Sequence, residues 1–195
     1  MGDSLRDKII VVTGAGGGIG SVAAAHLAEE GTSVLLTDLP QSSVEETAQS
    51  IRNRGLRARA VVADLSVESE IAEIFGGIVS IEGRIDGLLC CAGIGYQQFV
   101  LDTDGVAFDE VMAVNVRAIY LCCREAFLHM KEQRSGSLVL VASRLAAAAY
   151  PNMVPYITSK GAVVSMARAL AVDLGPHGIR VNSLSPGPTE TPMLQ

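Results

Sequence analysis

The chain has 195 residues, and 49% of them are hydrophobic, which is enough for one domain with a sizeable core and excludes a disordered protein. The formal net charge is −6, and the 15 lysine and arginine residues are spread along the chain. Because a nucleic-acid-binding surface needs clustered basic residues, we expect no nucleic-acid partner.

No targeting or membrane segment is predicted. The stretch MGDSLRDKIIVV carries charges where a signal peptide needs an apolar run. No run reaches the roughly 18 apolar residues that a membrane span needs. We therefore expect a cytoplasmic protein with no membrane partner.

The four cysteines form two adjacent pairs, Cys90-Cys91 and Cys122-Cys123. This spacing fits neither a zinc site nor a redox CxxC motif. We interpret the cysteines as small buried hydrophobic residues in a reducing compartment, and we expect no metal site.

Six short runs of apolar, often β-branched residues predict β-strands. They span 8–12, 33–37, 58–63, 87–90, 137–142 and 179–184. Their near-continuous hydrophobicity is typical of a parallel sheet that is covered on both faces.

Five longer amphipathic stretches between the strands predict helices, at 19–30, 41–54, 67–82, 105–132 and 155–174. Ser66 is placed to cap the third helix, Pro155 fits the first turn of the fifth, and Gly175 follows its last turn. The alternation of strands and helices predicts an α/β fold, a doubly wound parallel sheet in three α/β/α layers with right-handed crossovers.

A glycine-rich turn, TGAGGGIG (13–20), follows the first strand and precedes the first helix. Glycines let the backbone approach a ligand, and the amides at a helix N-terminus suit a pyrophosphate. The G-x-G-x-x-G pattern is not met, because its last position falls on Ile19. The alternative is a glycine-rich connection that only turns the chain.

Asp38 closes the second strand, 24 residues after Gly14. A carboxylate there accepts hydrogen bonds from the adenosine ribose and repels a 2′-phosphate, so it favours NAD over NADP. No Arg or Lys lies within the glycine turn or directly after Asp38. The alternative is a turn or helix cap before Pro40.

Tyr156 and Lys160 lie four residues apart on one helix and so share a face. A lysine ammonium beside a tyrosine hydroxyl favours the phenolate, which makes a general acid/base. Ser143, at the end of the fifth strand, is placed to hold a substrate oxygen. A serine hydrolase is disfavoured, because the histidines lie on helices or a helix terminus, at His26, His129 and His177. A chance surface pair remains the alternative for Tyr156 and Lys160 taken alone.

Taken together, these motifs resemble the short-chain dehydrogenase/reductase family from Lys8 to Met193. The resemblance rests on TGAGGGIG, Asp64-Leu65, CCAG (90–93), Asn115 in VNV, Ser143, YITSK and PGPTETPM. It implies one Rossmann-like dinucleotide-binding and catalytic domain over 1–195. The implied reaction is hydride transfer between a nicotinamide and a secondary alcohol or ketone, with NAD as cofactor.

The family assigns four catalytic roles to residues of this chain. Tyr156 would be the acid/base, Lys160 would favour its phenolate and bind the nicotinamide ribose, Ser143 would orient the substrate oxygen, and Asn115 would hold a water in a relay to Lys160. The implied cofactor contacts are Gly14, Gly18, Ile19 and Gly20 at the pyrophosphate, Asp38 and Leu39 at the adenosine, Asp64 and Leu65 at the adenine, Cys91, Ala92 and Gly93 along the floor, Pro186, Gly187, Thr189 and Thr191 at the nicotinamide, and Tyr156 and Lys160.

The chain departs from the family in two places. Cys90 and Cys91 replace two asparagines, and Gly18 stands where a hydroxyl residue is frequent. Family members also run on into a lid, a helix and a final strand, which we expect to be absent here. An inactive, truncated dinucleotide-binding protein is therefore one alternative.

Candidate substrate-pocket residues lie at 94–99, Arg144, Leu145 and 150–153. Their mostly apolar character favours a hydroxysteroid-like or small polyol substrate, with a 3-oxoacyl-carrier-protein reductase as the alternative enzyme. A solvated or structural role is expected for Arg144 rather than contact with an acidic substrate. The apolar-faced helices 105–132 and 155–174 resemble the family's dimer-forming pair, so we expect a homodimer.

Overall fold

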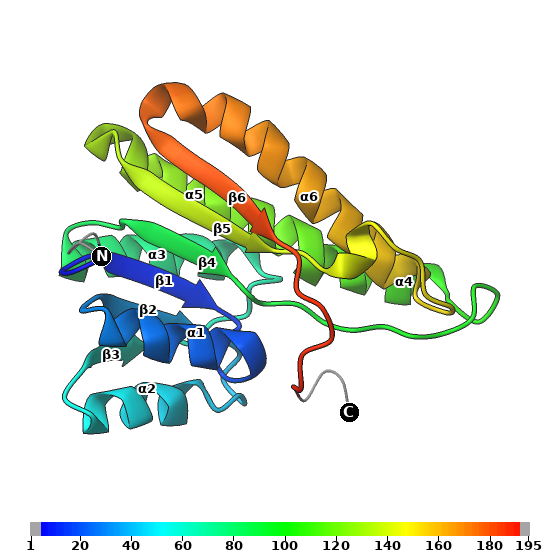
Figure 1. Cartoon of the computed structure of the whole chain (residues 1–195), viewed down its shortest axis with the longest axis horizontal. Helices are drawn as coiled ribbons and strands as arrows, with labels where there is room; N and C mark the ends of the chain where they lie inside the picture. The colour runs from blue at the N-terminus through cyan, green and yellow to red at the C-terminus, as the bar shows by residue number, and fades with distance from the viewer. Residues whose placement is uncertain (1–4, 192–195) are drawn as a thin grey trace.

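The computed structural model describes residues 5–191 and contains one six-stranded parallel sheet in the order β3-β2-β1-β4-β5-β6 (Figure 1). The strands are β1 Ile9–Thr13, β2 Ser33–Thr37, β3 Arg57–Ala60, β4 Gly87–Cys90, β5 Gly136–Val141 and β6 Ile179–Leu184. All six predicted strands are present. The third ends earlier than predicted, although the amides of Val61 and Ala63 still donate to the carbonyls of Leu36 and Asp38.

The helices are α1 Gly18–Glu29, α2 Val44–Asn53, α3 Glu68–Glu82, α4 Gly105–Met112, α5 Ala118–Gln133 and α6 Val154–Leu174, with short turns η1 Ala113–Arg117, η2 Arg144–Ala146 and η3 Gly175–His177. Alternate residues of β1 face opposite sides of the sheet. Val11 packs with α3, α5 and α6 in one hydrophobic cluster, and Val12 packs with α1 and α2 in the other. The three-layer, doubly wound Rossmann-like fold is therefore confirmed (Figure 1).

The predicted helix 105–132 is interrupted by the π-helical turn η1. Asp104 caps α4 by accepting a hydrogen bond from the Ala107 amide at 2.8 Å. The Ala118 amide bonds the Ala113 carbonyl five residues back, so one turn holds an additional residue. The sequence pattern predicted one unbroken helix here, and that detail is wrong.

One predicted helix end also differs. The residue before α3 is Val67, which makes no side-chain cap, while the Ser66 amide donates to the Asp64 carboxylate. Gly175 directly follows α6, as predicted, although its own φ is −52° and the left-handed residue is Gly178, at φ +77° after η3. Pro155 does lie in the first turn of α6.

The cysteines are free thiols at the centre of the molecule. Cys90, Cys122 and Cys123 are buried in the cluster beneath α3, α5 and α6, as predicted, and Cys91 is half-buried. Burial raises the pKa of the Cys122 thiol. Within residues 5–191, no helix is long and apolar enough to cross a bilayer.

Candidate active site

The glycine-rich turn joins the end of β1 to α1 and is shaped by close backbone packing. A Cβ at Gly20 would lie 2.2 Å from the Gly14 carbonyl oxygen, and one at Gly14 would lie 2.5 Å from the Ala92 amide nitrogen. A Cβ at Gly17 would meet no atom within 4 Å. The turn is thus packed on one side and open on the other, beside an N-terminus of α1 that no side chain caps.

Asp38 is tied to this turn. Its Oδ2 accepts a hydrogen bond from the Gly16 amide at 2.8 Å, and its Oδ1 accepts one from the Leu39 amide at 2.8 Å. Each carboxylate oxygen can accept a second hydrogen bond, so a ribose hydroxyl can still be bound. Asp38 therefore places a negative charge at the glycine turn and also serves as the turn cap that the sequence left as an alternative.

The loop after β3 carries Asp64 and Leu65. Glu70 accepts a hydrogen bond from the Asp64 amide at 2.7 Å, and the Asp64 carboxylate accepts one from the Ser66 amide at 2.8 Å. Leu65 is buried in the core. The loop is therefore held in one shape at the same edge of the sheet as Asp38, whose carbonyl accepts the Ala63 amide.

The loop after β4 is held by hydrogen bonds to Thr13 at the end of β1. The Cys91 amide donates to the Thr13 carbonyl and the Ala92 amide to the Thr13 Oγ1, each at 3.2 Å. A Cβ at Gly93 would lie 3.1 Å from the Asn115 Oδ1 and 3.4 Å from the Lys160 Nζ. A side chain at this position would require Asn115 or Lys160 to move by a few tenths of an ångström, so glycine favours the close approach of this loop.

Asn115 is fully buried in η1 and joins two parts of the site. Its Oδ1 accepts the Ile94 amide at 2.8 Å, while its Nδ2 donates to the Ile94 carbonyl at 2.9 Å and to the Ser159 Oγ at 3.1 Å. The Ser159 hydroxyl donates to the Tyr156 carbonyl at 2.7 Å. Asn115 thereby fixes the loop after β4 against α6.

Lys160 is buried, and its Nζ lies 5.7 Å from the centroid of the Tyr156 ring. The Nζ donates to the Val141 carbonyl at 3.0 Å. Burial lowers the pKa of Lys160 to about 8, and the nearby Cys91 and Cys90 thiols act in the opposite direction. Burial likewise raises the pKa of the Cys91 thiol to about 12, so this thiol does not neutralise the ammonium at neutral pH.

Ser143 follows β5, two residues after Val141, and is buried. Its Oγ accepts a hydrogen bond from the Leu145 amide at 3.1 Å. The next residue, Arg144, is exposed, and its guanidinium pairs with no side chain in residues 5–191. Ser143, Tyr156 and Lys160 thus come from β5 and α6 to one end of the sheet.

Residues 185–191 run from the end of β6 back towards the glycine turn (Figure 1). The Arg144 amide donates to the Pro186 carbonyl at 2.9 Å, and the Thr189 hydroxyl donates to the Gly187 carbonyl at 3.2 Å. A Cβ at Gly18 would lie 3.5 Å from the Thr191 methyl group. The segment therefore connects the Ser143 region to the glycine turn. The last motif residues, Pro192 and Met193, lie outside the described residues.

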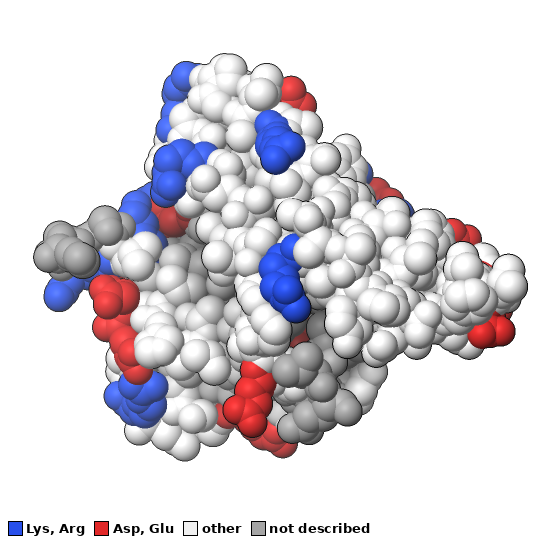
Figure 2. Space-filling view, turned by 45° about the vertical axis from the view of Figure 1, so that its right-hand side comes forward, with Lys and Arg blue, Asp and Glu red and all other residues white. Residues whose placement is uncertain are grey.

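Two of the candidate substrate-pocket stretches, 94–99 and 150–153, are also brought together, because the Gln98 amide donates to the Asn152 carbonyl at 2.7 Å. Phe99 and Tyr150 are both about half exposed on these stretches. Figure 2 turns this end of the molecule towards the viewer and shows a mostly uncharged surface on which Lys and Arg are scattered. In residues 5–191, no three His, Cys, Asp or Glu side chains gather to hold a metal ion.

A family model described as short chain dehydrogenase matches residues 8–195. The chain belongs to the short-chain dehydrogenase family. It is accordingly a nicotinamide-dependent oxidoreductase that acts on CH–OH groups.

Similar proteins agree with this membership. The 2-(R)-hydroxypropyl-CoM dehydrogenase of Xanthobacter autotrophicus is 40% identical over 195 residues, which covers 96% of this chain and 77% of the relative. A solved NAD+-bound xylitol dehydrogenase has a TM-score of 0.91 at 36% identity, covering 94% of this chain and 71% of that one. A 3-ketoacyl-(acyl-carrier-protein) reductase from Brucella melitensis, solved with NADH, has a TM-score of 0.92 at 36% identity, covering 98% and 79%.

In this short-chain dehydrogenase, several residues that support the site were missed by the sequence motifs. Val141 and Ile94 act through main-chain atoms, which carry no signal in the sequence. Thr13 and Ser159 lie inside the quoted motifs TGAGGGIG and YITSK, and their hydroxyls identify them as candidates for supporting hydrogen bonds.

Proposed function

We propose that the protein is an NAD-dependent dehydrogenase that moves a hydride between the nicotinamide and the carbinol or carbonyl carbon of a secondary alcohol or ketone. The observation that carries the proposal is the buried Lys160 ammonium, anchored to Val141 and 5.7 Å from the Tyr156 ring. Burying a cation costs free energy, and groups whose pKa is perturbed by burial cluster at functional sites, where stabilising a tyrosine phenolate is a function that a lysine can serve.

The described residues fit a dinucleotide. The open side of the turn at Gly17 and the uncapped N-terminus of α1 suit a pyrophosphate, and Asp38 can accept a ribose hydroxyl. When bound, the nicotinamide supplies the acceptor or donor of the hydride. Gly14, Gly18, Ile19 and Gly20 would surround the pyrophosphate, and Cys91 to Gly93 would line the floor.

In the proposed oxidation, Tyr156 takes the proton of the substrate hydroxyl while the carbinol carbon gives up its hydride. Ser143 donates a hydrogen bond that orients the substrate oxygen, and Lys160 stabilises the Tyr156 phenolate. The Asn115 amide is occupied by protein partners, so it would act by holding the loop and α6 around a relay water. Reduction of a ketone reverses these transfers.

The relatives support a secondary alcohol as substrate, since hydroxypropyl-CoM contains one and xylitol is a polyol. A carrier-protein reductase remains the second candidate. Preference for NADH does not separate the two, because the solved Brucella reductase is itself complexed with NADH. The substrate screen must therefore include a 3-oxoacyl thioester.

The test is an NAD-linked screen of secondary alcohols and polyols in the forward direction and of ketones and a 3-oxoacyl thioester in reverse. Tyr156→Phe removes the proton carrier and keeps the ring, and it is expected to lower kcat at least about a hundredfold. Tyr120→Phe, on the exposed face of α5, is the matched control and should retain activity. Equal rates in wild type and Tyr156→Phe would contradict the proposal. Cofactor binding without turnover of any substrate would favour the non-catalytic alternative.

We further propose a homodimer through 105–132 and 155–174. Tyr120 and Leu128 on α5 and Val172 on α6 expose 47%, 45% and 76% of their surface. Apolar side chains at this density on two helices favour burial against a second copy.

A further inference from the structure

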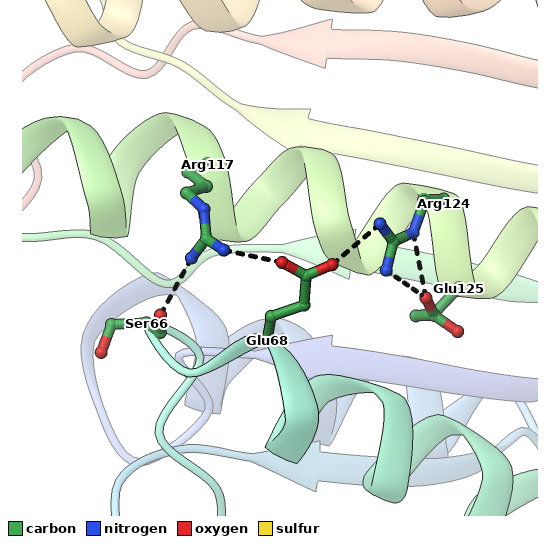
Figure 3. Close-up of polar contacts among 5 residues, drawn as sticks. All are labelled: Ser66, Glu68, Arg117, Arg124 and Glu125. Carbon is green, nitrogen blue, oxygen red and sulfur yellow. Dashed lines mark hydrogen bonds and ion pairs between the residues drawn. The ribbon is translucent and has the colours of Figure 1, made fainter.

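Arg117 is the last residue of η1, two positions after Asn115. Residues two apart on a helical turn point to different sides. Asn115 points into the buried centre and binds Ile94 and Ser159, while Arg117 is half-exposed and points towards the loop after β3 (Figure 3). One π-helical turn thus makes contacts on both of its sides.

The guanidinium of Arg117 binds that loop at two points. Its Nη1 donates to the Ser66 carbonyl at 3.1 Å, and its Nη2 pairs with the Glu68 carboxylate at 2.7 Å (Figure 3). Donors on a rigid planar fork fix direction as well as distance, which a lysine does not do. Arg117 therefore sets the position of residues 66–68 relative to η1.

The Val61 and Ala63 amides at the start of the loop donate to the Leu36 and Asp38 carbonyls, and the remaining hydrogen bonds of the loop are local. The Glu70 carboxylate accepts a hydrogen bond from the Asp64 amide, and the Asp64 carboxylate accepts one from the Ser66 amide. The Val67 amide donates to the Asp64 carbonyl. These bonds give the loop its shape without fixing it to η1. Among residues 5–191, Arg117 is the side chain that connects the main chain of this loop to the turn that holds Asn115.

We infer that Arg117 is a positioning residue for the adenosine half of the dinucleotide. It holds the Asp64-Leu65 loop in register with the π-helical turn that carries Asn115. This inference rests on the proposed function and on the contact of Asp64 and Leu65 with the adenine that the family resemblance implies. Its loss is expected to weaken binding of the adenosine half and to leave the nicotinamide half unaffected.

Arg124, on α5 seven residues after Arg117, is a matched control that binds the same Glu68 carboxylate. It also pairs with Glu68, at 3.0 Å, and it binds Glu125 at 2.8 Å, but it makes no bond to the main chain of the loop (Figure 3). Removing Arg124 takes away one partner of Glu68 without releasing Ser66. A comparison of the two arginines separates loss of an ion pair from loss of the loop contact.

The experiment measures binding of ADP-ribose and of nicotinamide mononucleotide to wild type, Arg117→Ala, Arg117→Lys and Arg124→Ala, all in the full chain. Because Arg117 is half-exposed, ADP-ribose should bind about two- to fivefold more weakly to Arg117→Ala. Arg117→Lys should fall between wild type and Arg117→Ala, because a lysine keeps the charge but not the fork. Nicotinamide mononucleotide should bind all four proteins equally, and Arg124→Ala should bind both ligands like wild type.

Hydrogen exchange gives a readout independent of ligand. The Asp64, Ser66 and Val67 amides should exchange faster in Arg117→Ala and not in Arg124→Ala. Unchanged ADP-ribose affinity in both Arg117 variants, or an equal loss in Arg124→Ala, overturns the inference. If Arg117→Ala does not fold, an ADP-ribose affinity of Arg117→Lys equal to that of wild type overturns the inference. Failure of the wild type to bind ADP-ribose or NADH instead overturns the proposed function.

Discussion

The Nζ of Lys160 on α6 donates a hydrogen bond to the Val141 carbonyl at the last residue of β5, over 3.0 Å. This bond joins the helix that carries Tyr156 to the strand that leads into Ser143. Among residues 5–191, this buried ammonium group binds one main-chain acceptor and no carboxylate, so the position of the charge is fixed while most of its desolvation cost is left uncompensated.

The stability of the protein should therefore depend on the protonation of Lys160. Its pKa is about 8 in the folded protein against 10.5 ordinarily, because burial disfavours the charge. Between these values the unfolded chain binds more protons than the folded one, so the free energy of unfolding rises with pH from about 8 to 10.5 and gains nothing from this group below 8. The rise should approach about 3 kcal/mol. The free energy of unfolding of wild type and of Lys160→Met is measured by urea unfolding from pH 8 to 10.5. The same pH dependence in both proteins would contradict the prediction.

Asn115 and Ser159 should contribute unequally to stability. Asn115→Ala leaves both the amide and the carbonyl of Ile94 without their buried partner and is expected to cost about 2–4 kcal/mol. Ser159→Ala removes one acceptor of the Asn115 Nδ2, but the Nδ2 still donates to the Ile94 carbonyl. This variant should therefore cost about 1 kcal/mol.

Urea unfolding of the two single variants and the double variant measures these costs. Because the two residues are in contact, the double variant should cost less than the sum of the single ones. Strict additivity would show that the Asn115–Ser159 bond carries no energy.

The strands and the ends of the strands could be predicted from the sequence, because strands buried on both faces leave apolar runs and the polar residues after them stand out. Asp38 and Ser143 were predicted from their places after strands, and the Tyr156–Lys160 pair was predicted from its four-residue spacing on one helix. The π-helical turn was missed, because one additional residue in a turn does not disturb the apolar pattern of a helix enough to be seen. The contact of Arg117 with Ser66 joins residues far apart in the chain, and no local pattern records it.

The interpretation of Ser66 as a helix cap failed for a related reason. The hydroxyl residue was in the expected place, but the nearby Asp64 carboxylate takes the Ser66 amide and α3 starts one residue later. Local hydrogen bonds, such as the one from the Asp64 amide to Glu70, compete with a helix cap, and the tertiary contact of Arg117 with the Ser66 carbonyl also holds this turn.

The homodimer predicts a specific sensitivity at Leu128. A charge in the centre of an apolar interface is strongly unfavourable, so Leu128→Glu should convert the protein to a monomer in size-exclusion chromatography with light scattering. Ile81→Glu on α3, where the side chain is 68% exposed, is the control and should leave the mass unchanged. A wild-type mass equal to one chain at all concentrations would rule out the dimer.

Cofactor choice should depend on the charge of Asp38. Asp38→Asn keeps an oxygen that can accept the Gly16 amide and removes the negative charge that would repel a 2′-phosphate. The ratio of NADP to NAD affinity should therefore rise by about tenfold or more, since a close like-charge contact costs on the order of 1.4 kcal/mol or more. Binding is measured by fluorescence of NADH and NADPH. Asp102→Asn, an exposed carboxylate in the loop before α4, is the control and should not change the ratio. An unchanged ratio in Asp38→Asn would mean that the carboxylate acts only as the cap of the glycine turn.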